Sequence, residues 1–279
     1  MAPALLAPEA AIRRFAELVR TGAVDESRGE LRLGIDLGTA NIVVSVVDAD
    51  NRPVTGAWVH STVVRDGVVV DWAGATMAVR RLKDEVELRL GHRFTSASVS
   101  IPPGISEGDT KVFRNVASAA GLDTEEVVDE PVAAARALGI TDGCVIDIGH
   151  GTTGVSILAD GEVLKSVDEA TGGHHMNLVL AGAYRIEYDA AEVMKKDPAR
   201  GDEVFGAIRP TLEKMASIAE AALLGYDVPA IYLVGGSSSF PHAPEVFASR
   251  LGRAVIRPPE PLFVTPLGIP MRRPADDRG

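Results

Sequence analysis

The sequence predicts an α/β protein made of two related lobes that face each other across a cleft. Strand-like apolar runs alternate with helix-like segments along most of the 279 residues. A short unit of strand, Gly-rich turn and strand occurs twice, around Asp36 and around Asp147, and each copy ends in a hairpin turn. Aromatic residues are few (7 Phe, 4 Tyr and 2 Trp), so Val, Ile, Leu and Ala must build the core.

Composition excludes several classes of protein. The 28 Lys and Arg stand against 39 Asp and Glu, and the net charge of −11 argues against binding to nucleic acid or to an anionic membrane. No apolar run approaches the roughly 18 residues that a membrane span needs. The one cysteine, Cys144, excludes an intramolecular disulfide framework and fits a reducing compartment. We therefore expect a cytoplasmic globular protein.

Residues 1–30 form an N-terminal extension that differs from the rest. Residues 9–21 predict one amphipathic helix with Ile12 and Phe15 on its apolar face, and Gly22 ends it. A polar linker then leads to the body. We expect the apolar face to pack on the body, because the short linker keeps the helix close to it and an exposed apolar face would favour aggregation. Docking of this helix on a partner protein is the alternative.

The first lobe is expected over residues 31–142. Its turn at Asp66-Gly67 precedes a short strand, and Ser106 with Asp109 resembles a capping box that opens a helix. Gly residues follow the helical segments and predict their ends. The expected strands are 35–37, 42–47, 68–70 and 96–101, and the expected helices are 75–90, 106–120 and 131–138.

The second lobe is expected over residues 143–260, with a small outer subdomain at about 177–229. A terminal helix over residues 261–279 is assigned to the first lobe.

The chain is expected to be a monomer or a small oligomer. The expected strands of the second lobe are 145–148, 155–158 and 231–234, and its expected helices are 174–183, 189–196 and 204–224.

The two Gly-rich turns are the strongest candidates for chemistry. Asp is a poor strand residue, yet Asp36 and Asp147 each end an apolar strand beside glycine. Because glycine has no side chain, an anion can come close to the backbone N–H groups there, and the carboxylates can hold a hydrated Mg²⁺. Ordinary hairpins are the alternative, but the duplication favours two turns that clasp a polyphosphate. The N–H groups expected to bind phosphate belong to Gly38, Thr39, Gly151 and Thr152.

Other candidate residues carry weaker signals. Glu130 precedes Pro131 at a helix start, where its local pattern favours a plain N-cap. Gly235-Gly236 follows an apolar strand and either admits a nucleoside close to the backbone or forms a simple turn. His174 and His175 are adjacent on a helix and cannot share one metal well. Cys144 is expected to be a small core residue.

Five motifs in order resemble the actin-like and heat-shock-chaperone-like ATPase superfamily, which has duplicated ribonuclease H-like lobes around a nucleotide cleft. Residues 35–39 and 145–157 resemble its two phosphate motifs, and 233–237 its adenosine motif. Residues 129–135 and 264–268 resemble its connecting segments. The resemblance implies ATP or ADP with Mg²⁺, Mg²⁺ near Asp36 and Asp147, and catalysis by Glu130 with Asp147. The implied nucleotide-binding residues are Asp36, Gly38, Thr39, Ala40, Gly149, Gly151, Thr152, Thr153, Gly172, Gly173, Glu192, Lys195, Gly235, Gly236 and Ser237.

Within that superfamily the chain is most similar to the EutJ family of ethanolamine utilization. Residues 65–67, 129–131, 168–175 and 263–267 carry this similarity, together with the length. The resemblance implies a link to an ethanolamine-type bacterial microcompartment. It also implies a chaperone-like or reactivating role toward a microcompartment enzyme, such as ethanolamine ammonia-lyase, or toward a shell protein.

Three departures from the chaperone pattern predict slow hydrolysis. His150 replaces the middle glycine of the second phosphate motif, and Gly154 stands where that motif has an Asp. Lys83 lies in the region of the chaperone's catalytic lysine, but in the wrong context. Nucleotide binding is therefore better supported than turnover. The rival interpretations are a pseudo-ATPase scaffold, an actin-like assembly protein and a small-molecule kinase.

Overall fold

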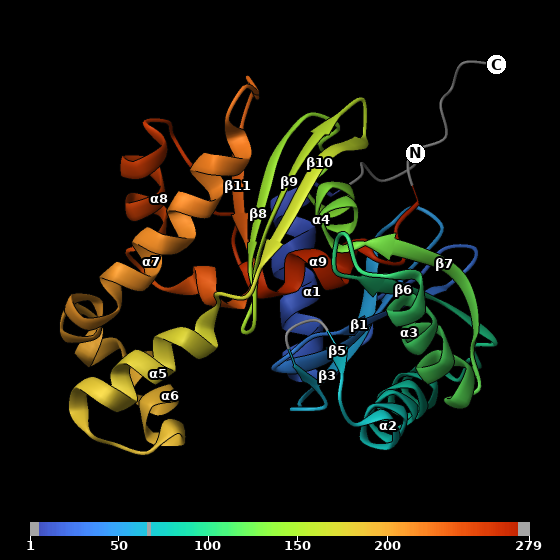
Figure 1. The fold of residues 1–279 in the computed structure, drawn as a ribbon. Coiled ribbons are helices and arrows are strands. Elements are labelled where there is room, and N and C mark those ends of the chain that lie inside the picture. The colour runs from blue at the N-terminus through green and yellow to red at the C-terminus, as the bar shows by residue number, and fades with distance from the viewer. Residues whose placement is uncertain (1–5, 66–67, 273–279) are drawn as a thin grey trace.

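The chain folds around two mixed β-sheets with matching topology, described here for residues 6–65 and 68–272 of a computed structural model (Figure 1). The first sheet has the strand order β3-β2-β1-β6-β7, and the second has the order β10-β9-β8-β11. The strands of the first sheet are β1 (Arg32–Leu37), β2 (Asn41–Val47), β3 (Pro53–His60), β6 (Ser96–Ile101) and β7 (Asp123–Asp129). Those of the second are β8 (Gly143–Ile148), β9 (Thr153–Ala159), β10 (Glu162–Glu169) and β11 (Ile231–Val234).

The two sheets repeat the same pairing pattern, which confirms the expected duplication. In each, three consecutive strands pair antiparallel, and a later strand joins the first of them in parallel. Asp36 pairs with Val43 in the first sheet, and Asp147 pairs with Gly154 in the second. The two aspartates therefore hold equivalent positions. The first sheet also has β7 at its edge, which the sequence analysis did not predict.

Two helices and a small hairpin complete the first lobe. Helix α2 (Trp72–Leu90) begins three residues earlier than expected, because the Asp71 carboxylate accepts a hydrogen bond from the Gly74 N–H at 2.9 Å. Helix α3 (Glu107–Ala119) is capped by Ser106, as predicted. Strands β4 (Val64–Arg65) and β5 (Val68–Val69) form the hairpin. The turn predicted at Asp66-Gly67 lies outside the described residues.

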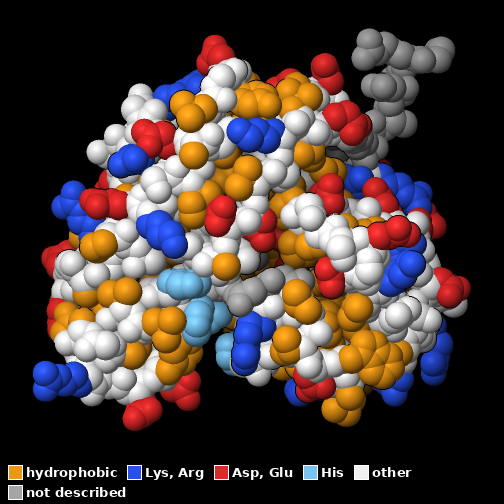
Figure 2. All heavy atoms as spheres, viewed as in Figure 1, with side chains coloured by type: hydrophobic (Ala, Val, Ile, Leu, Met, Phe, Trp, Pro, Cys, Tyr) orange, Lys and Arg blue, Asp and Glu red, His pale blue; other side chains and the backbone are white. Residues whose placement is uncertain are grey.

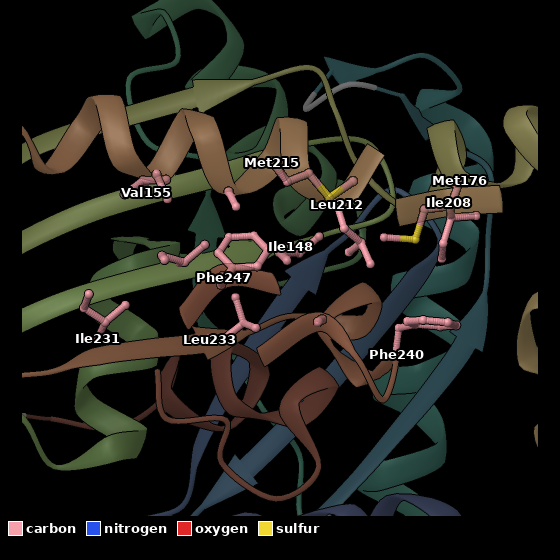
Figure 3. Packing of buried hydrophobic residues seen from close by; sticks show 14 of the residues in the cluster. Ile148, Val155, Met176, Ile208, Leu212, Met215, Ile231, Leu233, Phe240 and Phe247 are labelled. Carbon is pink, nitrogen blue, oxygen red and sulfur yellow. The ribbon is translucent and has the colours of Figure 1, made fainter. Parts of the chain in front are cut away.

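Helices α5 (Gly173–Tyr184), α6 (Tyr188–Lys196), α7 (Gly201–Leu223) and α8 (Ala243–Leu251) complete the second lobe. Figure 3 shows α7 laid along the sheet, with apolar side chains from both in one core. Ile208 and Leu212 of α7 are fully buried there, as is Phe247 of α8. Helices α5 and α6 lie on the opposite side of the molecule from α2 and α3 (Figure 1). Cys144 is fully buried in β8, as predicted.

Two short segments connect the lobes at the centre of the molecule (Figure 1). Helix α4 (Glu130–Leu138) packs closely on α9 (Val264–Gly268), which follows a 3₁₀ turn at Pro261–Phe263. A Cβ on Gly268 would lie 1.7 Å from the Ala133 carbonyl oxygen, so this crossing requires glycine. The helix predicted over residues 261–279 is wrong in its extent, since regular helix ends at Gly268. Pro270 lacks an N–H to extend it, and residues 273–279 lie outside the described part.

Helix α1 (Pro8–Thr21) packs on the body, which confirms the expectation for its apolar face. Ile12, Phe15 and Leu18 are fully buried. The Phe15 ring meets Phe263 edge to face, with centroids 5.9 Å apart. The helix shares one apolar cluster with residues of β2, α4, α9 and the second sheet. Since the body covers this face, it is not free to dock on a partner.

None of the helices in the described residues is long and apolar enough to cross a membrane. The longest, α7, carries charged side chains along its length and packs on a sheet.

Replacing Phe15 by Ala is expected to lower the free energy of unfolding by about 3–5 kcal/mol, because it leaves a cavity between α1 and the connecting segments. Urea denaturation measures the change. Arg13→Ala on the exposed face of the same helix is the matched control and is expected to stay within about 0.5 kcal/mol. Equal stability of the two variants would contradict the packing role of α1.

Candidate functional site

A cleft of about 660 Å³ lies between the two lobes, where the two Gly-rich turns face each other. Figure 2 shows a hollow between the lower parts of the molecule, with histidine side chains at its edge. His60 and His150 are in the lining. The volume is that of a typical site for a small-molecule ligand or cofactor.

The cleft brings most of the predicted site residues together. Those in its lining are Asp36, Gly38, Thr39, Ala40, Glu130, Asp147, Gly149, Gly151, Thr152, Glu192, Lys195, Gly235, Gly236 and Ser237. Thr153, Gly172 and Gly173 are outside the lining. The Thr153 hydroxyl donates to the Thr171 carbonyl at 2.6 Å, and the Gly173 N–H donates to the Gly149 carbonyl at 3.0 Å. These three residues support the second turn from outside the cleft.

Close backbone packing explains the glycines of the second turn. The Gly149 N–H donates to the Thr152 carbonyl at 3.0 Å, which closes the turn. A Cβ on Gly172 would lie 2.5 Å from the His150 carbonyl oxygen. In the first turn, a Cβ on Gly38 would lie 2.8 Å from the Asn41 carbonyl oxygen. Glycine thus lets both turns pack tightly beside the cleft, and backbone without a side chain suits the close approach of an anion.

Three carboxylates meet at the floor of the cleft. Asp36 accepts a hydrogen bond from the Ser100 hydroxyl at 3.3 Å, and Asp147 accepts one from Thr265 at 3.1 Å. Loss of solvent raises the pKa of Asp36 to about 7, with repulsion from Asp147 adding to it. Loss of solvent likewise raises the pKa of Asp147 to about 6 and that of Glu130 well above its usual value. The floor of the cleft is thus short of positive charge.

Mg²⁺ fits this floor through water and phosphate rather than through side chains alone. Hard carboxylate oxygens are the ligands it prefers, and it keeps several waters when it binds beside phosphates. The described residues contain no group of three or more His, Cys, Asp or Glu that could hold a metal by themselves. Asp36 and Asp147 are the residues that would face such a hydrated ion.

The opposite wall of the cleft carries the residues expected near adenosine. Glu192 pairs with Lys195 at 2.7 Å, and Lys195 also donates to the Gly173 carbonyl at 3.2 Å. Although loss of solvent acts against it, the charge of Lys195 holds the pKa of Glu192 at about 2. Ser237 donates to the Gly149 carbonyl at 2.8 Å and so ties this wall to the second phosphate turn. A Cβ on Gly235 would lie 2.1 Å from the Asp147 carboxylate, so glycine is required beside it.

One local interpretation changes in the structure, whereas the placement of Lys83 agrees with its expected wrong context. Glu130 is not an N-cap, because Asp129 occupies that position and makes no side-chain cap hydrogen bond. Glu130 is the first residue of α4 and lines the cleft. Lys83 lies outside the lining, 3.6 Å from the Asp84 carboxylate. It therefore cannot act as the chaperone lysine in this arrangement.

His150 turns its ring toward Tyr188 rather than presenting a charge to the cleft. Its Nε2 lies 3.0 Å from the Tyr188 hydroxyl, which also lies 2.8 Å from Nδ1 of His174. Loss of solvent, with Lys195 adding repulsion, lowers the pKa of His150 to about 4. The ring is neutral at physiological pH. Tyr188 and His60 were missed by sequence reasoning, since neither lies in a recognisable motif.

Asp168 of β10 is the most important residue that sequence reasoning did not assign to the site. It lines a cavity of about 40 Å³ beside the main cleft, together with Glu130 and Asp147. Its charge contributes to the raised pKa of both. A bulge between Val163 and Lys165 shifts the β9–β10 register by one residue and so places Asp168 opposite Gly154. Regular pairing from the turn at Asp160-Gly161 would have placed Val167 there instead.

Comparison with known proteins decides the family. Residues 71–200 match the model of the Hsp70 protein family. The ethanolamine utilization protein EutJ of Escherichia coli strain K12 is 42% identical over 251 residues, which cover 90% of this chain and 88% of that protein. The chain belongs to the EutJ family of ethanolamine utilization proteins.

Solved structures agree with this assignment. A crystal structure of EutJ from Carboxydothermus hydrogenoformans has a TM-score of 0.89 and 43% identity, over 94% of this chain and 97% of that one. MreB 5 of Spiroplasma citri, bound to AMPPNP, has a TM-score of 0.69 at 19% identity, over 88% of this chain and 95% of that one. The second likeness shows the fold alone. This EutJ family member therefore has the duplicated actin-like α/β fold.

Asp147→Asn is expected to affect stability and ligand binding in opposite directions. It removes one of three like charges but keeps an acceptor for Thr265, so the melting temperature without nucleotide should rise by roughly 3–6 °C. Affinity for Mg-ATP should fall at least about tenfold. Thermal melts and calorimetric titration measure the two effects.

The matched control is Asp160→Asn on an exposed hairpin turn, which should change neither quantity. Unchanged Mg-ATP affinity in Asp147→Asn would remove Asp147 from the metal site.

Proposed function

We propose that this EutJ family member binds ATP and ADP with Mg²⁺ in the cleft and acts as a nucleotide-dependent, chaperone-like factor in ethanolamine utilization. Its client in this proposal is a microcompartment enzyme, such as ethanolamine ammonia-lyase, or a shell protein. One observation carries the nucleotide assignment: two equivalent aspartates, each beside a Gly-rich turn, line one cleft from opposite sheets.

Three comparisons support the proposal. A protein of the same fold, MreB 5 of Spiroplasma citri, was crystallised with the ATP analogue AMPPNP. Membership of the EutJ family supplies the ethanolamine context. The match to the Hsp70 family model over residues 71–200 supports a chaperone-like use of the nucleotide. The protein would work in the cytoplasm, beside the microcompartment that it serves.

The roles of the lining residues follow from their placement. Backbone N–H groups of the two turns would bind the phosphates, with Gly38 and Thr39 on one side and Gly151 and Thr152 on the other. Mg²⁺, when bound with nucleotide, would neutralise phosphate charge and polarise the terminal phosphate. Asp36 and Asp147 would hold its water ligands. The pair Glu192 and Lys195, with Ser237, would contact the nucleoside, and Glu130 would orient the attacking water.

A pseudo-ATPase scaffold is the second candidate, and a specific observation favours it. Lys83 lies outside the cleft, and the lysines that line the cleft, Lys195 and Lys196, both pair with Glu192. A lysine near the terminal phosphate normally stabilises charge in phosphoryl transfer. In this interpretation the protein binds nucleotide and changes its partner contacts without turnover.

Calorimetric titration with ATP and ADP, with and without Mg²⁺, tests nucleotide binding, and a phosphate-release assay then tests turnover. We expect Mg²⁺-dependent binding and slow release. Glu130→Gln should lower the rate about 10²–10⁴-fold with affinity little changed, because it removes the base that orients water.

Glu107→Gln is the matched control, since Glu107 is likewise the first residue of a helix but is exposed. A wild-type rate in Glu130→Gln would remove its role. Binding without any phosphate release in the wild type would favour the scaffold.

Client binding should depend on the nucleotide. We expect the affinity for purified ethanolamine ammonia-lyase or a shell protein to differ at least about fivefold between the ATP and ADP states, a typical allosteric coupling. Analytical ultracentrifugation measures it. Equal affinity in both states would contradict the chaperone-like role, and ATP-dependent pelleting of the protein alone would favour actin-like assembly instead.

A further inference from the structure

A carboxylate on β10 lies beside the space that Gly154 leaves free in the second phosphate motif. Gly154 stands where the chaperone pattern has Asp. Asp168 pairs directly with Gly154 across the antiparallel β9–β10 ladder. An oxygen of its carboxylate lies 3.5 Å from the position that a Cβ on residue 154 would take. Side chains of directly opposed residues in a ladder project from the same face of the sheet. A carboxylate at either of the two positions can therefore reach the same region.

The carboxylate borders a small polar cavity. The cavity has a volume of about 40 Å³, and Glu130, Asp147, Thr152 and Gly154 line it together with Asp168. A water molecule takes up about 30 Å³ of liquid, so the cavity has room for one. Loss of solvent raises the pKa of Asp168, and the neighbouring Thr152 in the same lining partly offsets this rise. Acceptors on several sides suit a water molecule, which has two protons to donate.

The glycine is part of the arrangement. An Asp at position 154 would bring a second carboxylate against Asp168, since that Cβ already lies in contact with it. Like charges at such a distance destabilise each other. Gly154 and Asp168 therefore form a matched pair in which one strand supplies the carboxylate and the other leaves the space.

We propose that the cavity holds the water that attacks the terminal phosphate, and that Asp168 is a positioning residue that accepts one hydrogen bond from it while Glu130 accepts the other. This inference rests on the proposed function. The water oxygen forms a new bond to the terminal phosphorus as the bond to the bridging oxygen breaks. The electron pair stays on ADP, and the water proton passes through Glu130 to the released phosphate. The site therefore keeps a carboxylate, that of Asp168, although position 154 has Gly in place of Asp.

The test uses three variants of the full chain. Asp168→Asn keeps the size of the side chain but weakens its acceptance of a hydrogen bond from water. The transplant Gly154→Asp with Asp168→Gly moves the carboxylate back to β9. Glu169→Gln is the matched control, because Glu169 is the next residue of β10 and is absent from both linings. Phosphate release under single-turnover conditions and calorimetric titration with Mg-ADP are measured for each.

We expect Asp168→Asn to slow phosphate release about 10²-fold, with Mg-ADP affinity within threefold of the wild type. The transplant should recover the rate to within tenfold of the wild type, and Glu169→Gln should match the wild type. Asp168 is exposed on its outer side, so these variants are expected to fold, and thermal melts check this.

Three results would overturn the inference. A wild-type rate in Asp168→Asn would show that the water does not need this carboxylate. A transplant as slow as Asp168→Asn would show that the carboxylate does not act from the position of residue 154. Mg-ADP binding by the wild type without any phosphate release would overturn the water site while nucleotide binding stands. Failure of the wild type to bind Mg-ADP would instead overturn the proposed function itself.

Discussion

The convergence of carboxylates at the floor of the cleft is the constraint on which the rest of this structure depends. Asp36, Glu130 and Asp147 face one another with little solvent, and the groups that hydrogen-bond to the aspartates are neutral hydroxyls. Such a cluster costs folding free energy and persists because the surrounding fold fixes it. In the proposed function, a hydrated divalent cation bound with the nucleotide would offset that repulsion. The cluster would then cost less free energy with ligand bound than without it.

The connecting segments fix the distance between the two sheets. Helix α4 carries Glu130 at its first residue, and its close crossing with α9 at Gly268 holds the lobes together behind the cleft. Helix α1 fills the same junction with Phe15 against Phe263. The N-terminal extension is thus part of the frame that positions the turns. If nucleotide binding changed the angle between the lobes, the contacts among α1, α4 and α9 would have to rearrange.

Local patterns predicted the parts of this fold that are set locally. The strand–turn–strand units around Asp36 and Asp147, the cap at Ser106 and the buried face of α1 all follow from short stretches of sequence. Non-local pairing was harder to predict. Asp168 became visible once β10 was paired with β9, and Tyr188 once α6 was packed beside His150. Thr153 was assigned to the cleft, but it begins β9 and turns inward to Thr171.

The proposed metal-nucleotide site can be tested by a crystal structure with ADP and Mn²⁺ in place of Mg²⁺, because the anomalous signal of Mn²⁺ identifies the position of the ion. We expect one ion between Asp36 and Asp147, bound through water, with the phosphates on the backbone of both Gly-rich turns. An empty floor with ADP bound elsewhere, or an ion that touches neither aspartate, would contradict it.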